Sequence, residues 1–267
     1  MSIFEAVILG AVQGITEFLP VSSSGHLVLF QRIFGISGDN LFFDTLVHGG
    51  TLIAVFIVLW KDIRVILKRI VQPLTAYLIL GTIPAVIAAL LFDEVIERVF
   101  FTGSFLGFAF LITAILLFSS EMLHRYSLNL VQTKKMNWID ALIIGILQAI
   151  AIIPGVSRSG STLSGALFRR LDRDFAARFS FLLSIPAILG ALILQAKDLL
   201  KGTGAPETGI SPAALTAGVL TAAIVGFFSI KLMLKIVRER SLLGFALYTA
   251  ILGILVLIDR LFSHIFF

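Results

Sequence analysis

The chain has 267 residues, of which 58% are hydrophobic and only 14% charged, and its mean hydropathy is +1.04. This composition excludes an ordinary water-soluble domain, which needs a polar outside. The absence of cysteine excludes disulfides, thiolate metal sites and a cysteine nucleophile. The basic residues behind the net charge of +5 are scattered among short loops, which argues against a nucleic-acid partner.

The N-terminal segment, residues 1–35, combines a short apolar run, a polar loop and a second short apolar run. Residues 1–10 carry no basic n-region and no small-residue cleavage site, so we expect no removable signal peptide. A run of about a dozen residues is too short to cross a bilayer at about 1.5 Å per residue. The pattern predicts a re-entrant helix-loop-helix whose loop points inward, because irregular backbone at membrane depth must be buried in protein or line a wet cavity.

The loop of this segment carries an unusual set of polar residues for a membrane chain. Gln13 and Glu17 are four residues apart and share one helix face. Glu17 and His26 flank three serines at positions 22–24. A carboxylate and an imidazole are costly to bury in a membrane, which favours a functional role. The alternative is that the serines cap the following helix and that His26 is a satisfied interfacial histidine.

Six later apolar runs predict transmembrane helices, at about residues 41–60, 73–92, 104–120, 176–196, 212–232 and 242–260. Asp44 and His48 lie four apart at the start of the first run. They belong either to the surroundings of a site or to a simple interfacial pair, and we favour the interfacial pair.

An internal repeat divides the chain near its middle. Residues 8–28 align without gaps onto residues 143–163 at an offset of 135, with eight of 21 positions identical. The repeat predicts a second re-entrant helix-loop-helix. We therefore expect one polytopic membrane domain over residues 1–267, with one repeat over about 1–135 and the other over about 136–267.

The basic residues predict the orientation of the chain in the membrane. If residues 1–35 enter and leave on the outer side, fifteen of the 21 basic residues fall in cytoplasmic loops, as the positive-inside rule requires. The first hairpin then opens outward and the second inward. This arrangement predicts an all-α integral membrane protein built as an inverted-topology repeat, each half with one re-entrant hairpin and three transmembrane helices. The fifteen residues are Lys61, Arg64, Lys68, Arg69, Arg125, Lys134, Lys135, Arg169, Arg170, Arg173, Arg178, Lys231, Lys235, Arg238 and Arg240.

The second loop, residues 154–162, has the composition of a phosphate-binding loop. Gly155 lets the backbone turn tightly, hydroxyls and amides at a helix N-terminus donate hydrogen bonds, and Arg158 adds a fixed charge with a bidentate fork. The alternative is that Arg158 merely pairs with Glu17 across the repeat axis. The two interpretations are compatible.

The sequence resembles the undecaprenyl pyrophosphate phosphatases associated with bacitracin resistance. The residues that carry the resemblance are the segment from Gln13 to His26, the segment from Pro154 to Thr162, and the runs Phe43 to Leu52 and Phe179 to Pro186. The resemblance extends over the full length of the chain. It implies hydrolysis of a C55 isoprenoid diphosphate to the monophosphate carrier lipid used for peptidoglycan and other cell-wall polymers.

The resemblance also implies roles for individual residues. Glu17 and His26 are expected to be the acid-base or metal-coordinating pair, Ser23 the nucleophile, and Arg158 the centre of a diphosphate clamp. The remaining clamp residues are Ser22, Ser24, Gly155, Ser157, Ser159 and Thr162. Direct attack by water stays open as an alternative to Ser23.

A divalent cation is the implied cofactor, Mg²⁺ in the first place and Ca²⁺ as the alternative. Glu17 and Gln13 are its candidate ligands. Gln13 stands where some members of the family have glutamate, and an amide supplies oxygen but no charge, which weakens a two-carboxylate site.

The expected setting is the bacterial inner membrane, with the active site open to the outer face and any oligomer a dimer. The expected partners are the polyprenyl diphosphate substrate and membrane lipids. The alternative function is transport or flipping of a polyprenyl phosphate lipid by the same inverted-repeat site, because a phosphate clamp serves both. Transport alone requires no nucleophile or base, so Ser23 and His26 favour the enzyme.

Overall fold

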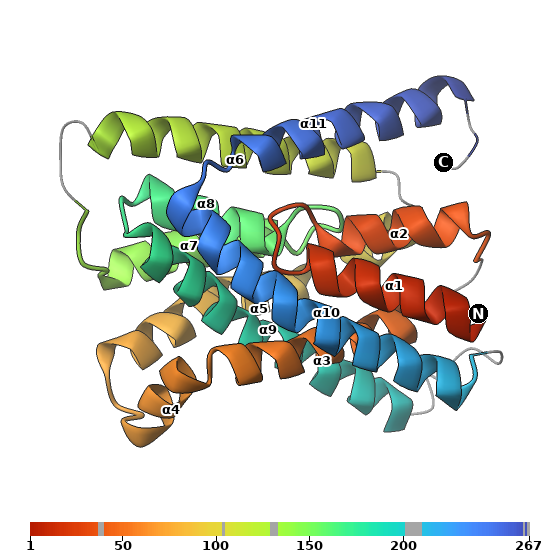
Figure 1. Cartoon of the computed structure of the whole chain (residues 1–267), viewed down its shortest axis with the longest axis horizontal. Helices are drawn as coiled ribbons and strands as arrows, with labels where there is room; N and C mark the ends of the chain where they lie inside the picture. The colour runs from red at the N-terminus through yellow and green to blue at the C-terminus, as the bar shows by residue number, and fades with distance from the viewer. Residues whose placement is uncertain (37–39, 103–104, 129–132, 201–209, 264, 266–267) are drawn as a thin grey trace.

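The computed structural model describes residues 1–36, 40–102, 105–128, 133–200, 210–263 and 265. These residues form eleven α-helices and no strand, and α11 ends in a π-helical turn at Asp259–Ser263 (Figure 1). The helices are α1 (Ile3–Thr16), α2 (Ser23–Ile33), α3 (Leu41–Val58), α4 (Trp60–Lys68), α5 (Pro73–Thr102), α6 (Leu106–Leu128), α7 (Trp138–Ile150), α8 (Arg158–Phe168), α9 (Arg173–Leu200), α10 (Pro212–Glu239) and α11 (Leu243–Ile258).

Six of these helices are long and apolar enough to cross a membrane, and each matches one of the six runs predicted from the sequence. The spans are Leu41–Val58, Pro73–Phe92, Leu106–Tyr126, Arg173–Lys197, Pro212–Glu239 and Leu243–Phe262. Their outward faces expose large apolar side chains, among them Leu90, Ile193 and Leu247. Such a surface requires hydrocarbon rather than water around it. The chain is therefore a multi-pass membrane protein.

The short helix α4 is the element that the sequence did not predict. Its residues were assigned to a loop because of the basic residues around Lys61 and Lys68. In the structure α4 is amphipathic: Ile63 is buried and Ile66 packs against the main core, while Lys61 and Lys68 remain exposed. Because α4 has only nine residues, its apolar stripe was too short to stand out in the sequence.

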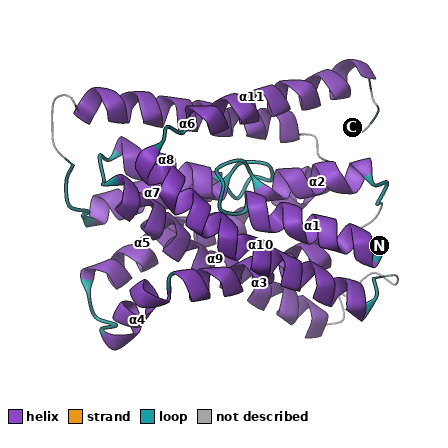
Figure 2. Ribbon diagram, viewed as in Figure 1, coloured by secondary structure: helices purple, strands orange, loops and turns teal. Residues whose placement is uncertain are grey.

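Four other short helices form two hairpins, α1–α2 and α7–α8. They have 14, 11, 13 and 11 residues. At about 1.5 Å per residue none reaches across the roughly 30 Å of a bilayer core. Figure 2 shows that the hairpins enter the bundle from opposite ends and that their loops lie side by side near its centre.

Close backbone contacts hold each hairpin against one long helix. A Cβ atom at Gly10 of α1 would lie 2.3 Å from the carbonyl oxygen of Gly218 in α10, and one at Gly145 of α7 would lie 2.7 Å from that of Gly81 in α5. Both distances are shorter than any ordinary contact, so only glycine permits this approach. The glycines at positions 10 and 145 thus set the depth at which the two loops sit.

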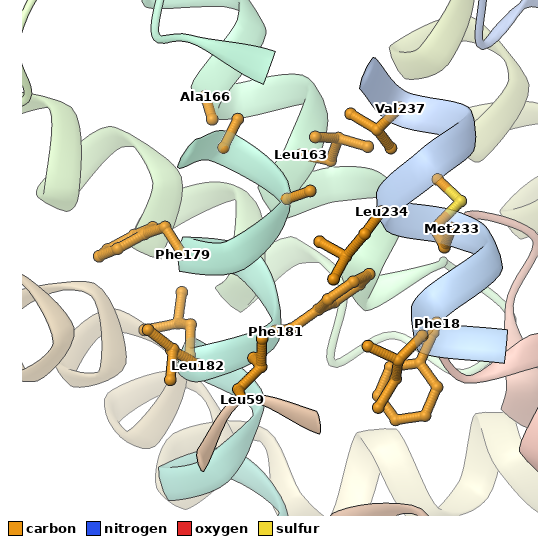
Figure 3. Packing of buried hydrophobic residues seen from close by; sticks show 14 of the residues in the cluster. Phe18, Leu59, Leu163, Ala166, Phe179, Phe181, Leu182, Met233, Leu234 and Val237 are labelled. Atoms are coloured by element: carbon orange, nitrogen blue, oxygen red, sulfur yellow. The ribbon is translucent and has the colours of Figure 1, made fainter. Parts of the chain in front are cut away.

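The main hydrophobic core supports the loops from one side. Figure 3 shows Phe18 and Phe181 packed against Met233 and Leu234 of α10. The rings of Phe18 and Phe181 meet edge to face with centroids 5.4 Å apart. Phe18 is fully buried and directly follows Glu17 in the chain. The core therefore fixes the backbone from which the Glu17 side chain extends.

Buried carboxylates with cationic partners hold several helix ends together. Asp140, at the start of α7, is fully buried and accepts hydrogen bonds from Lys134 Nζ at 2.7 Å and Arg169 Nε at 2.6 Å. Burial alone would raise the pKa of Asp140, but these two partners hold it below its ordinary value. In the same way, Glu121 binds Arg173 at 3.0 Å and Arg125 at 2.9 Å.

Candidate active site

The loop of the first hairpin begins at the end of α1 and turns sharply at Ser22. Glu17 is the C-cap residue of α1. Ser22 adopts the left-handed φ of 74°, which is uncommon for a residue with a side chain. Its Oγ accepts a hydrogen bond from the backbone N–H of Gly25 at 3.2 Å and so caps α2. This turn brings Ser23 back toward Glu17, and a serine held at such a φ is typical of a functional loop.

The loop of the second hairpin is built in the same way. Gly155 has a φ of 92°, and Ser157 caps α8 by accepting a hydrogen bond from the N–H of Gly160 at 3.1 Å. Thr113 of α6 anchors the loop, because its Oγ1 accepts a hydrogen bond from the N–H of Ser157 at 3.0 Å. Arg158 is then the first residue of α8, and its side chain extends from this fixed point.

The two loops contact each other directly. The N–H of Gly155 donates to Ser24 Oγ at 3.2 Å, and Ser159 Oγ donates to the carbonyl oxygen of Leu19 at 3.1 Å. One hydrogen bond thus runs in each direction between the loops. Because each loop is also anchored in its own hairpin, their relative position is fixed before any ligand binds.

Glu17 lies where the two loops meet, at what we call the junction, and is 6% exposed. One carboxylate oxygen, Oε1, forms an ion pair with Arg158 Nη2. The other oxygen, Oε2, accepts hydrogen bonds from Ser23 Oγ at 2.6 Å and Gln13 Nε2 at 3.1 Å. The pairing of Glu17 with Arg158 that the sequence suggested is confirmed. Three of the predicted residues therefore share one buried carboxylate.

This junction opens into a cavity of about 360 Å³. Its polar wall combines Glu17, Ser23, Ser24 and Arg158 with residues of α3, and its apolar wall comes from α9 and the second loop. The complete lining is Glu17, Ser23, Ser24, Leu27, Leu41, Asp44, Thr45, His48, Ala151, Ile152, Pro154, Val156, Arg158, Ala187, Ile188 and Ala191. A charged end beside an apolar wall suits a ligand with an anionic head and a hydrocarbon tail.

The structure places His26 in a different cavity. His26 Nδ1 lies 2.7 Å from the carbonyl oxygen of Ser22, and Nε2 lies 2.7 Å from the hydroxyl of Tyr248. Its ring stacks on Tyr248 and meets Phe110 edge to face. The cavity beside it, of about 660 Å³, also includes Arg240. Both ring nitrogens of His26 therefore have partners other than Glu17. The predicted role of His26 beside Glu17 stays a prediction, and no contact between the two residues supports it.

The other residues of the predicted clamp mostly stabilise the loops. Thr162 Oγ1 donates to the carbonyl oxygen of Arg158 at 2.9 Å and lies 2.5 Å from Ser180 Oγ. Ser157 and Ser159 are buried and lie 3.3 Å apart at their hydroxyls. These contacts, like the capping bond of Ser22, hold backbone in place. Among the predicted hydroxyls, those of Ser23 and Ser24 belong to residues that line the cavity at the junction.

Asp44 and His48 belong to the surroundings of the candidate site, and the interfacial pair that the sequence analysis favoured is a wrong description of them. Asp44 is only 3% exposed, and both residues line the cavity with Glu17. His48 Nε2 lies 3.5 Å from Glu17 Oε2. The sequence showed two polar residues four positions apart in an otherwise apolar span. This spacing does not indicate whether the two side chains face the interior of the protein or the membrane interface.

The side chains of Glu17 and Gln13 offer oxygen atoms of the kind that bind a divalent cation. Gln13 Oε1 is a buried acceptor without a hydrogen-bond partner among the described residues, and it belongs to the same amide that binds Glu17. No group of three or more His, Cys, Asp or Glu residues with metal-ligand geometry lies within those residues. Mg²⁺ commonly takes one or two protein oxygens and completes its shell with waters and phosphate oxygens.

The family model and the curated relatives that match this chain point to the same family. The family model described as bacitracin resistance protein BacA matches residues 6–255. The undecaprenyl-diphosphatase of Carboxydothermus hydrogenoformans is 45% identical over 258 residues, which cover 97% of each chain. That of Halothermothrix orenii is 44% identical, covering 97% of this chain and 98% of its own. Undecaprenyl-diphosphatase 4 of Bacillus thuringiensis is 44% identical over the whole of both chains.

Proposed function

The chain belongs to the family of the bacitracin resistance protein BacA, and we propose that it is an undecaprenyl-diphosphate phosphatase. It hydrolyses undecaprenyl diphosphate to undecaprenyl monophosphate and phosphate, which regenerates the carrier lipid for cell-wall polymer synthesis. Relatives that match it over nearly their whole length carry the name undecaprenyl-diphosphatase. The observation that carries the proposal is the buried junction of Glu17, Ser23 and Arg158, open to a cavity with an apolar wall.

Binding of the head group begins at Arg158. In the ligand-free protein its guanidinium is paired with Glu17 and donates to the carbonyl oxygen of Ser180 at 3.3 Å. A diphosphate carries more charge than one carboxylate and offers several oxygens to the planar fork. The head group therefore competes for Arg158 and releases Oε1 of Glu17. Substrate binding and exposure of the carboxylate are thus a single event.

Ser23 is positioned for attack on the terminal phosphorus. Its hydroxyl already donates to Glu17 Oε2 at 2.6 Å. The Oγ–P bond forms as the bond from phosphorus to the bridging oxygen breaks, and the hydroxyl proton passes to Glu17. The bridging oxygen leaves with the lipid monophosphate. Water then cleaves the phosphoserine, releasing phosphate and restoring the serine hydroxyl.

Glu17 and the amide oxygen of Gln13 would hold a divalent cation, Mg²⁺ in the first place, together with phosphate oxygens. When bound, such an ion would neutralise negative charge on the head group. The protein's own contribution is the fixed charge of Arg158 and the position of Ser23. Gln13 contributes oxygen but no charge, so this ligand pair holds one carboxylate, which favours an ion that enters with the substrate over a permanently bound one.

The experiment that tests this function measures phosphate release from a C55 diphosphate by the purified full-length protein in detergent with Mg²⁺. We expect the wild type to release phosphate and Arg158→Ala to lose at least about 10³-fold in kcat/KM. Arg64→Ala is the matched control, because Arg64 is exposed on α4 away from the junction. A folded wild-type protein that releases no phosphate would refute the proposal.

We extend the proposal to the architecture, which we infer to be an inverted repeat of two halves in one membrane domain. Local features that recur 135 residues apart in the two halves support this inference. Capping boxes open α1 and α7, formed by Ser2 with Glu5 and by Asn137 with Asp140. The serine caps of α2 and α8 and the glycine contacts of α1 and α7 recur in the same way. Hairpins that start at opposite ends of the bundle then correspond to re-entrant segments from opposite sides of the membrane.

The orientation in the bacterial inner membrane follows from the same arrangement. Figure 1 places α4 and the C-terminal ends of α6, α8 and α10 at one end of the bundle. The basic residues predicted to be cytoplasmic lie in these segments, in the loops next to them or at the start of α9. The positive-inside rule makes this end cytoplasmic, so the α1–α2 hairpin enters from the outer face and the substrate reaches Glu17 from that side. Any oligomer is expected to be a dimer.

A further inference from the structure

An imidazole from outside both hairpins faces the Glu17 carboxylate. His48 lies in the second turn of α3, and its Nε2 is 3.5 Å from Glu17 Oε2. The same oxygen accepts the hydrogen bond from Ser23 Oγ at 2.6 Å. The serine hydroxyl and the imidazole therefore converge on one carboxylate oxygen, in the wall of the cavity that all three residues line.

The orientation of the His48 ring follows from its second nitrogen. Nδ1 lies 2.6 Å from the carbonyl oxygen of Asp44, one turn earlier in α3. A carbonyl oxygen only accepts hydrogen bonds, so Nδ1 must carry the hydrogen. In the neutral imidazole, Nε2 then carries the lone pair, at the edge of the ring that faces Glu17. The backbone of α3 thus selects which ring nitrogen serves the site.

Contacts between helices fix the position of α3 at this point. Asp44 Oδ1 accepts a hydrogen bond from Gln31 Nε2 at 2.7 Å, and both residues are buried. Gln31 belongs to α2, the helix that begins at Ser23. Thr51 Oγ1 donates to the carbonyl oxygen of His48 at 2.8 Å. The helix that carries the imidazole is therefore tied to the helix that carries the serine.

We propose that His48 is a positioning residue of the hydrolytic site, with Nε2 serving as a second acceptor for the Ser23 hydroxyl beside Glu17 Oε2. When the diphosphate takes Arg158 from Glu17, the carboxylate loses its main anchor, and His48 keeps the hydroxyl hydrogen directed away from the phosphorus. A lone pair of Ser23 Oγ then faces the reacting atom. This inference deepens the proposed function and rests on it.

The contacts of His26 add to the case for His48. Both ring nitrogens of His26 are engaged, with Ser22 and Tyr248, and its cavity is not the one that Ser23 lines. His48 of α3 is thus the imidazole that the structure brings to Glu17.

Two substitutions of similar size separate the proposed role from a merely structural one. In His48→Gln a polar atom takes the place of Nε2, whereas in His48→Asn it takes the place of Nδ1. We measure kcat and KM for phosphate release from C55 diphosphate, with thermal unfolding in detergent to confirm folding. We expect His48→Gln to keep kcat within about 10-fold, and His48→Asn and His48→Ala to lose about 10²-fold, with KM changed less than about 3-fold.

A higher kcat for His48→Asn than for His48→Gln would overturn the inference, because only the contact with Asp44 would then matter. A folded His48→Ala with wild-type kcat would overturn it as well. Both results leave the proposed function intact, since the wild type is active in each. A wild type without phosphate release would instead refute the proposed function and this inference with it.

Discussion

Glu17 and Arg158 are 141 positions apart in the sequence and belong to different hairpins, yet their side chains form an ion pair at the junction of the two loops. Each loop alone lacks half of the site, since the first supplies the carboxylate and serine and the second the fixed positive charge. The pair therefore holds the hairpins together in the free protein and is the contact that an anionic head group must open.

The planar fork of Arg158 should matter beyond its charge. Arg158→Lys keeps a cation but loses bidentate contact with phosphate oxygens and the simultaneous bond to the Ser180 carbonyl. We expect kcat/KM for phosphate release to fall about 10²-fold, with the thermal unfolding temperature in detergent nearly unchanged. Activity equal to wild type in Arg158→Lys would show that only a point charge is needed.

The two serines that line the cavity should behave differently. Ser23→Ala removes the proposed nucleophile, so we expect phosphate release to fall at least about 10³-fold. Ser24 accepts the hydrogen bond from Gly155 and supports the loop contact, so Ser24→Ala should remain within about 10-fold of wild type. Steady-state rates of both purified variants decide the matter. Unchanged release by Ser23→Ala would assign the attack to water.

Chelation and the residue at position 13 test the cation. EDTA should abolish phosphate release, and added Mg²⁺ should restore it. Gln13→Glu adds a second carboxylate beside Glu17 and should lower the Mg²⁺ concentration for half-maximal rate by about 10-fold. Release that persists in EDTA would remove the cation from the account, and an unchanged Mg²⁺ requirement in Gln13→Glu would remove residue 13 from its binding site.

The glycines that seat the hairpins can be tested by stability. Gly10→Ala and Gly145→Ala place a Cβ atom against the backbone of α10 and α5, and each should cost about 1 to 3 kcal/mol of unfolding free energy. Gly190→Ala is the control, because a Cβ built at Gly190 meets no described atom within 4 Å beyond its chain neighbours and the backbone of its own helix. Thermal unfolding in detergent reports all three. Equal stability for Gly10→Ala and Gly190→Ala would contradict the close packing.

The Asp140 cluster should contribute stability that acid removes. Its partners hold the Asp140 pKa below the ordinary 3.8, so the contribution is fully present above that value and is lost as the pH falls through the lowered pKa. Asp140→Asn should therefore lower the unfolding temperature at pH 7, and the difference from wild type should shrink as the pH falls below 3.8. A difference that grows on acidification would have the wrong sign.

Much of this structure could be predicted from the sequence because a membrane constrains it strongly. Six apolar runs gave six helices, and the repeated Gln, Ser and Gly positions located both loops. The pairing of Glu17 with Arg158 was accessible because both residues would be unpaired charges if their loops lay apart. Pattern and polarity alone were sufficient for these features.

Side-chain positions that depend on how a helix is rotated about its axis could not be predicted from the sequence. His26 follows Ser23 by three residues, but the turn at Ser22 and the contacts with Tyr248 and Phe110 direct it to another cavity. His48 lies in a separate helix, and only the packing of α3 on the first hairpin brings it to Glu17. A spacing in one segment does not determine which face a neighbouring segment covers.

A photoreactive polyprenyl diphosphate with a diazirine in its first isoprene unit tests the central claim, which is that the head group binds between the two hairpin tips. After irradiation with the full-length protein, mass spectrometry identifies the labelled residues. We predict labels on the apolar wall of the junction cavity, at Leu27, Ile188 and Ala191, and their loss in Arg158→Ala. Labels confined to the cavity of Phe30, Phe245 and Tyr248 would contradict the account.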